Sequence, residues 1–179
     1  RSPAQSWARG GALLYETGGY MRKADSHAKS VKKELDLLLT LHHLNIVKVV
    51  AHGEEGGRVW FDMPILKPLV SVDCNALAEE QRQKIITGVA DALNYLHDRK
   101  LAHRDVHPSN VLLDADYTPY LTDFAWAHPC EGEPCVDFKP WACPDRAVPS
   151  VQMGMDQRGY HTIVAHVRGL SLGASRATG

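Results

Sequence analysis

Three polar residues at fixed spacings constrain this chain more than any other feature. Asp105 and Asn110 lie five positions apart, and Asp123 follows 18 positions after Asp105. Apolar residues on either side of a turn predict a hairpin over residues 111–122, which places Asp123 at its far end. Oxygen ligands of this kind suit Mg²⁺, and a nearby carboxylate can take a proton from a hydroxyl group. The pattern therefore favours phosphoryl transfer, which needs those groups held rigidly together.

Composition sets the class of protein. The chain has 179 residues, of which 44% are hydrophobic and 23% charged, so we expect one domain or two small lobes rather than disorder, collagen or a coiled coil. A formal charge of -1 argues against a polybasic surface for a nucleic-acid polymer. No apolar run is long enough to predict a membrane span.

The ends and the cysteines give further expectations. The chain begins with Arg1 rather than Met and shows no secretory signal, so we expect a fragment of a cytoplasmic protein. Four cysteines in a chain of this size do not make a disulfide scaffold, and reduced thiols are expected.

Apolar spacing and turn residues predict a strand-rich first third and a more helical remainder. The predicted strands cover residues 12–15, 20–24, 46–50, 59–61, 111–113 and 120–122. The predicted helices cover residues 28–41 and 77–98, and residues 53–57 read as a turn. Residues 150–179 show five glycines and only a weak apolar cluster.

The polar residues sit in two recognisable motifs. The segment His103-Arg104-Asp105-Val106-His107-Pro108-Ser109-Asn110, followed by Asp123-Phe124-Ala125, resembles the catalytic loop and metal-binding motif of eukaryotic-type protein kinases. The surroundings of Pro108 favour the Ser/Thr branch of that family. The resemblance implies that Asp105 is the catalytic base and that Asn110 and Asp123 hold Mg²⁺. It also implies ATP as cofactor and a protein as substrate.

The resemblance extends toward the N-terminus. Lys23 stands where the family has the lysine that holds the α- and β-phosphates, and Glu34 where it has that lysine's ion-pair partner. Gly10 and Gly11 resemble the last part of the glycine-rich loop over the phosphates. Phe61-Asp62-Met63 falls where the interlobe hinge is expected, so that peptide groups from Asp62 to Pro64 would face the adenine edge.

These matches together imply an α+β, bilobal, protein-kinase-like fold with a small strand-rich N-lobe and a shortened helical C-lobe. We expect the N-lobe in residues 1–63, the C-lobe with catalytic loop and activation segment in residues 64–149, and a divergent tail in residues 150–179. Cys143-Pro144-Asp145 resembles the end of the activation segment.

The sequence also departs from the family. His107 replaces a lysine that contacts the transferred phosphate, and an imidazole with an ordinary pKa near 6.5 carries only partial charge at neutral pH. Ala125 replaces a glycine, and Pro64 has no N–H to offer adenine. No Ser, Thr or Tyr lies between Asp123 and Asp145. Arg104 therefore needs a negative partner other than a phosphorylated residue there, for which we consider the acidic residues Glu131, Glu133 and Asp137.

Other interpretations stay open on the sequence. The polar loop residues also suit turn capping, and Lys23 with Glu34 also suits a solvated surface pair. Two other functions fit the motifs, namely a nucleotide-binding pseudokinase scaffold and a phosphotransferase for small molecules. A zinc clip is a further alternative, with His128, Cys130, Cys135 and Cys143 as its ligands.

Overall fold

The computed structural model describes residues 6–7, 11–130 and 151–170. Its strands are β1 (Ser6–Trp7), β2 (Leu13–Thr17), β3 (Tyr20–Ala24), β4 (Ala51–Glu55), β5 (Arg58–Pro64), β6 (Lys67–Pro68), β7 (Leu101–Ala102), β8 (Val111–Leu113), β9 (Pro119–Leu121) and β10 (His128–Pro129). Its helices are α1 (Lys32–Leu38), α2 (Glu79–Asp98) and α3 (Val151–Arg168), with single 3₁₀ turns at Leu69–Ser71, Cys74–Ala76 and Pro108–Asn110.

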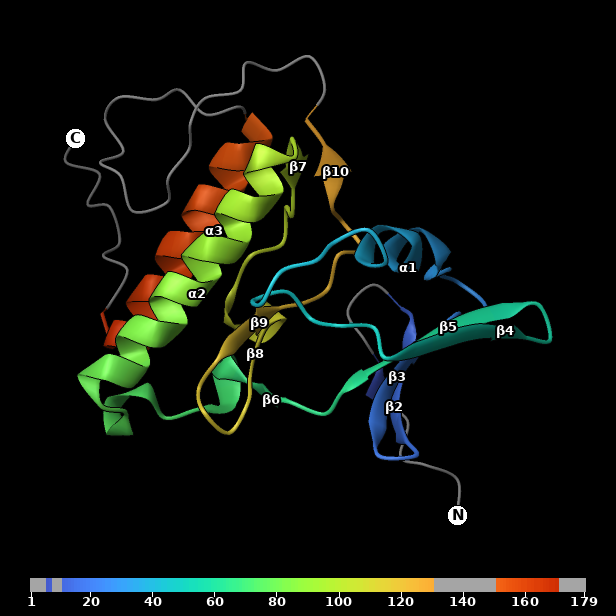
Figure 1. Ribbon diagram of the computed structural model, residues 1–179, viewed down its shortest axis with the longest axis horizontal. Helices are drawn as coiled ribbons and strands as arrows, with labels where there is room; N and C mark the ends of the chain where they lie inside the picture. Colours follow the sequence, from blue (N-terminus) through green and yellow to red (C-terminus); the bar gives the residue numbers. More distant parts are fainter. Residues whose placement is uncertain (1–5, 8–10, 131–150, 171–179) are drawn as a thin grey trace, which may run out of the picture.

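The N-terminal part is an antiparallel sheet with the strand order β1-β2-β3-β5-β4, and α1 lies beside it (Figure 1). A tight turn at Gly18 and Gly19, both with positive φ, joins β2 to β3 as the paired glycines predict. The register of β3 with β5 places Lys23 opposite Phe61 and Met21 opposite Met63. Because these residues are two apart in each strand, all four side chains belong to one face of the sheet.

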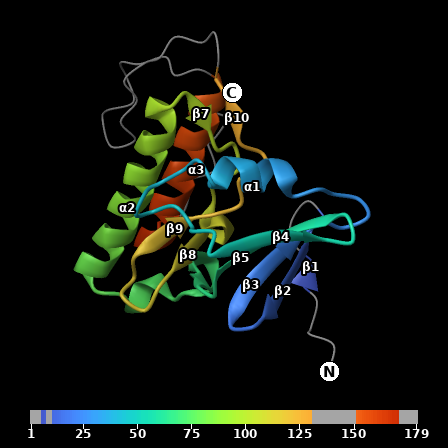
Figure 2. The ribbon, with the colours of Figure 1, turned by 45° about the vertical axis from the view of Figure 1, so that its right-hand side comes forward.

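The second part is helical. The helices α2 and α3 run side by side, and the small β6-β8-β9 sheet lies between this pair and the N-terminal sheet (Figures 1 and 2). Apolar residues at helical spacing on α2, including Ile85, Val89, Leu93 and Leu96, are fully buried in the core that joins both parts. This arrangement confirms the expected kinase-like fold, with a strand-rich N-terminal part and a helical remainder.

Two predicted elements are wrong and one is shorter than predicted. Residues 46–50 are not a strand; Ile46 makes an isolated bridge to Leu121, and the strand β4 occupies residues 51–55 instead. The turn is therefore limited to Gly56 and Gly57, both with positive φ. The helix predicted for 28–41 is confined to α1, because Asp25 and Ser26 accept backbone N–H groups and hold the preceding residues in turns.

The helix α3 was not among the helices predicted from the sequence. It packs against α2 and against the loop that carries Asp105. Tyr160, Ile163 and Val167 are buried at helical spacing along it. Gly159 allows the closest approach, because a Cβ atom there would lie 2.2 Å from the backbone oxygen of Val106.

We expect the substitution Gly159→Ala to reduce the free energy of unfolding by about 2 kcal/mol, because the added methyl group forces α3 away from Val106. Urea unfolding of the purified chain measures this. Arg158→Ala, at an exposed position of the same helix, is the matched control and should change stability by less than about 0.5 kcal/mol. Equal stability of Gly159→Ala and the unmodified chain would contradict this account of the packing.

Candidate functional site

A buried ammonium group joins three elements. The side chain of Lys23, in β3, is 6% exposed, and its Nζ lies 2.8 Å from Glu34 Oε2 in α1 and 3.4 Å from Asp123 Oδ1. An exposed surface pair is thereby excluded, and the ion pair expected from the resemblance is present. The wide spacing in sequence is bridged because the turn-rich residues 25–31 bring α1 back against the sheet.

Two opposing effects act on the pKa of Lys23. Burial lowers this pKa, whereas the nearby carboxylates of Glu34 and Asp123 raise it, and the net result is a pKa above the ordinary value. The side chain is therefore an ammonium ion across the physiological pH range, and it keeps a positive charge at the inner end of the cleft.

Glu34 also holds the backbone beyond Asp123. Its Oε1 accepts the backbone N–H of Phe124 at 3.0 Å, while its Oε2 pairs with Lys23. Asp123 has a φ of 60°, a conformation that few non-glycine residues adopt, and its Oδ1 accepts the N–H of Ala125 at 3.4 Å. The two carboxylates and the following backbone thus form one hydrogen-bonded unit.

Asp105, His107 and Asn110 meet on the loop before β8. The Nδ2 atom of Asn110 lies 3.0 Å from Asp105 Oδ2 and 2.8 Å from the Asp105 backbone oxygen. The Nε2 atom of His107 lies 3.2 Å from Asp105 Oδ1 and 3.1 Å from Asn110 Nδ2. Because the nitrogen of the Asn110 carboxamide is engaged with Asp105, the oxygen of that group is the end suited to a cation.

A fully buried carboxylate in α3 is hydrogen-bonded to the backbone of this loop. Asp156, in α3, accepts the backbone N–H groups of His103 and Arg104 at 2.8 and 2.7 Å, and lies 2.8 Å from His97 Nε2. His103 in turn contacts the backbone oxygen of Thr122 through Nε2 at 2.8 Å. The sequence did not predict this role of Asp156 as the support of the loop.

A cleft of about 290 Å³ lies between the N-terminal sheet and the small sheet. Lys23, Asn110 and Asp123 line its polar end. Its other walls are mostly apolar and are formed by Leu14, Met21, Met63, Pro64, Leu66, Pro68, Ser109, Leu112 and Thr122. A slot of this character suits a flat, largely apolar base at one end and charged groups at the other.

Comparison with known proteins gives the same result. A model of the protein kinase domain matches residues 20–141, which is more than half of the chain. The chain belongs to the protein kinase domain family.

Individual kinases match over shorter stretches. The chain is 34% identical to an Aurora kinase of Candida glabrata over 105 residues, which is 55% of this chain and 29% of that kinase. It is 36% identical to the serine/threonine-protein kinase PknF of Mycobacterium tuberculosis over 105 residues, or 53% and 22% of the two chains. It is 37% identical to the L-type lectin-domain containing receptor kinase VIII.2 of Arabidopsis thaliana over 114 residues, or 58% and 16%. The chain thus spans less than a third of the length of these relatives.

The structure places the three residues of the predicted hinge differently relative to the cleft. Met63 lines the cleft, but Phe61 and Asp62 do not. Phe61 is fully buried opposite Lys23 in the sheet, and Asp62 points to the other face of β5, where it pairs with Arg22 at 2.7 and 2.9 Å. Residues two positions apart share a face of a strand, so Asp62 cannot share the face of Met63.

Part of the backbone of the predicted hinge is hydrogen-bonded within the sheet. The backbone oxygen of Asp62 accepts the N–H of Val50 at 2.9 Å within the sheet. Further along the chain, Met63, Pro64 and Leu66 line the slot.

Some predictions concern residues outside the described ranges. Gly10, the acidic residues considered for Arg104, and Cys143-Pro144-Asp145 lie there, as do the two zinc-clip cysteines Cys135 and Cys143. Gly11 has a positive φ of 86° just before β2 and does not line the cleft. Within the described ranges, no group of three or more His, Cys, Asp or Glu residues could hold a metal ion. In the same residues, no helix is long and apolar enough to cross a membrane.

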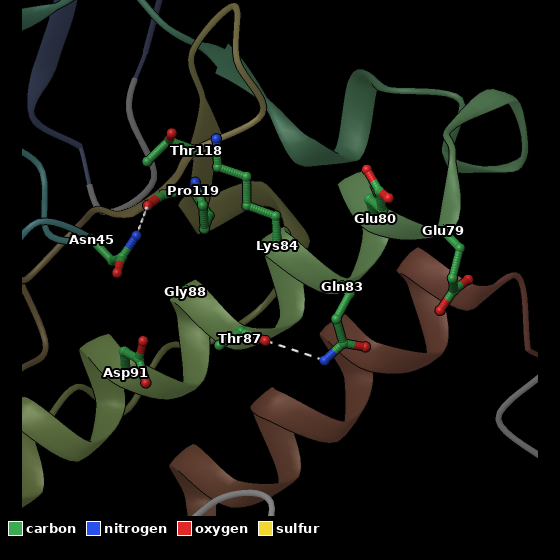
Figure 3. A pocket seen from close by; sticks show the side chains of 10 residues that line it. All are labelled: Asn45, Glu79, Glu80, Gln83, Lys84, Thr87, Gly88, Asp91, Thr118 and Pro119. Atoms are coloured by element: carbon green, nitrogen blue, oxygen red, sulfur yellow. Dashed lines mark hydrogen bonds between the residues drawn. The ribbon is translucent and has the colours of Figure 1, made fainter.

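A more open hollow of about 630 Å³ lies on the outer side of α2 (Figure 3). Glu80, Lys84 and Asp91 of α2 border it, and Asn45 donates to the backbone oxygen of Pro119 at its edge. None of the predicted site residues in the described ranges lines it, whereas Lys23, Met63, Asn110 and Asp123 line the smaller cleft.

We expect Lys23→Met to reduce the free energy of unfolding by about 3 kcal/mol, because it leaves Glu34 and Asp123 buried without their cation. Urea unfolding at pH 7 measures this. Lys32→Met is the matched control: Lys32 is 65% exposed in its pair with Asp36, and its loss should cost less than about 0.5 kcal/mol. Equal losses for the two variants would show that burial of the Lys23 pair contributes nothing.

Proposed function

We propose that this chain transfers the γ-phosphate of ATP to Ser or Thr hydroxyl groups of proteins. The observation that carries the proposal is the convergence on one cleft of Lys23, Asn110 and Asp123, with Asp105 held beside Asn110. Membership of the kinase family and similarity to serine/threonine-protein kinases support the same reaction. We also propose that the lobes meet near residue 64, that α3 belongs to the helical lobe, and that the protein works in the cytoplasm.

In this proposal the base of ATP occupies the apolar slot. Leu14 and Met21 cover it from the N-terminal sheet, and Leu112 supports it from β8. The triphosphate then points toward the ammonium group of Lys23, whose charge is fixed by Glu34 and Asp123. An ammonium held in this way binds phosphate oxygens without having to reorganise.

The residues present also fit a magnesium ion. Mg²⁺ is commonly bound by one or two protein oxygen ligands together with substrate phosphates, and Asn110 and Asp123 supply such oxygens on the same cleft. When bound, the ion neutralises charge on the phosphates. Asn110 and Asp123 would hold the ion in the cleft that Lys23 also lines.

Asp105 would act as the base. Its two oxygens are held by contacts with Asn110 and His107, and its backbone N–H donates to His103 Nδ1 at 3.2 Å. A carboxylate fixed in this way accepts the proton of the substrate hydroxyl as the oxygen attacks phosphorus. In the proposed mechanism, Asp156 fixes the loop and thereby the position of this carboxylate.

We expect Asp105→Asn to lower turnover by about 10²- to 10⁴-fold while leaving Mg-ATP binding within about threefold. Transfer of labelled phosphate to a panel of Ser/Thr peptides measures turnover, and thermal shift with Mg-ATP measures binding. Labelling of choline or an aminoglycoside in place of the peptides would support a small-molecule phosphotransferase instead. Binding of Mg-ATP without labelling of any acceptor would contradict the enzyme proposal.

One observation favours a nucleotide-binding scaffold as a second candidate. His107 contacts both Asp105 and Asn110, where the family resemblance implies a lysine that contacts the transferred phosphate. The chain therefore lacks the lysine ammonium group that would stabilise the charge developing on the phosphoryl group.

We expect His107→Lys to raise turnover about fivefold at saturating ATP, because the ammonium group supplies a full positive charge near Asp105. His107→Gln, which keeps a polar side chain without charge, is the control and should not increase turnover. Unchanged or lower turnover in His107→Lys would show that the imidazole does not limit phosphoryl transfer.

A further inference from the structure

The residues after Asp123 are attached to both parts of the molecule. The N–H of Phe124 donates to Glu34, in α1. Two residues later, the backbone oxygen of Trp126 accepts the Nε–H of Arg104 at 2.7 Å. The strand β10 then pairs with β7, with His128 opposite Ala102. Backbone contacts therefore hold residues 124–130 along their whole length.

The side chain of Trp126 makes a contact of a different kind. The indole is 51% exposed, and the ammonium nitrogen of Lys29 lies 5.4 Å from the ring centroid. A cation at this distance over an indole face is attracted by the ring. Trp126 is thus held at its backbone by the loop of Asp105 and contacts the N-terminal part through its ring.

Lys29 lies in the connection that leads from β3 to α1. Lys29 belongs to residues 25–31, which connect β3 to α1, and its backbone exchanges hydrogen bonds with Ser26 at 2.9 and 3.1 Å. Asp25 Oδ1 accepts the N–H of Val31 at 2.7 Å, directly before α1 begins. Such a turn transmits a restraint on Lys29 to α1 and to Glu34.

We propose that Trp126 is a positioning residue that latches the β3–α1 connection onto the segment after Asp123. The latch favours the arrangement in which Glu34 contacts both Lys23 and Phe124. It requires no phosphate on that segment: residues 124–144 contain no Ser, Thr or Tyr, and Arg104 already donates to the Trp126 carbonyl group. The functional consequence rests on the proposed phosphoryl transfer, whereas the latch itself is a property of the fold.

Hydrogen exchange of the whole chain tests the latch without relying on activity. Trp126→Ala and Lys29→Ala should each raise the exchange rates of amides in residues 25–38 about two- to fivefold, the size expected for an exposed cation–aromatic contact. The double variant should show no further increase, and Trp126→Phe should retain most of the protection. Arg99→Ala is the control, because it removes a contact of the same type, 3.6 Å from the Tyr95 ring centroid, on α2.

The outcomes decide the proposal in either direction. Unchanged exchange in residues 25–38, additive effects in the double variant, or an equal change in Arg99→Ala would each overturn it. In a chain that turns over ATP, Trp126→Ala should also lower kcat with little change in KM for the peptide, and Trp126→Phe should restore kcat. If the chain shows no transfer, the exchange measurements alone still decide whether the latch exists.

Discussion

A cation that is almost fully buried cannot stand alone, and this requirement organises the cleft. Lys23 carries its charge at 6% exposure only because Glu34 and Asp123 lie within 3.4 Å. These residues come from three separate elements, so compensation of one charge fixes β3, α1 and the end of the β8–β9 hairpin relative to one another. The second oxygen of Glu34 extends the restraint to the backbone of Phe124. The site is therefore positioned by the pairing of buried charges as well as by apolar packing.

A buried negative charge, the carboxylate of Asp156, holds the loop of Asp105 in a similar way. Asp156 has no exposed surface, and its carboxylate is compensated by two backbone N–H groups and His97. A loop that bends as sharply as this one, with Arg104 at a φ of 69°, needs such an attachment to keep its shape. The helix α3 is thus a structural requirement of the loop that carries Asp105, and Gly159 lets this helix approach Val106 closely.

The sequence was sufficient where a short motif determines both local shape and chemistry. The paired glycines predict the β2–β3 turn, and the hairpin and the spacing of Asn110 and Asp123 predict that these two residues lie close together, with Asp105 beside Asn110. Prediction failed where contacts between the two parts decide the outcome. Residues 46–50 were predicted as a strand because they are mostly apolar. In the structure, however, the N–H of Val47 donates to the backbone oxygen of Leu121 in the other part, and β4 forms the edge of the N-terminal sheet instead. The helix α3 was obscured by its glycines, although the spacing of Tyr160, Ile163 and Val167 was a usable signal.

The charges of the cleft bear on what it can bind. Glu34 and Asp123 supply two carboxylates around the single ammonium group of Lys23, so these three side chains do not attract a triphosphate by their charges alone. Binding of a polyanion beside these carboxylates becomes favourable only if a further positive charge enters with it. Asn110 and Asp123 offer the oxygen atoms that a divalent cation prefers, at the same end of the cleft as Lys23. Under the proposed function, nucleotide and magnesium therefore bind as a unit.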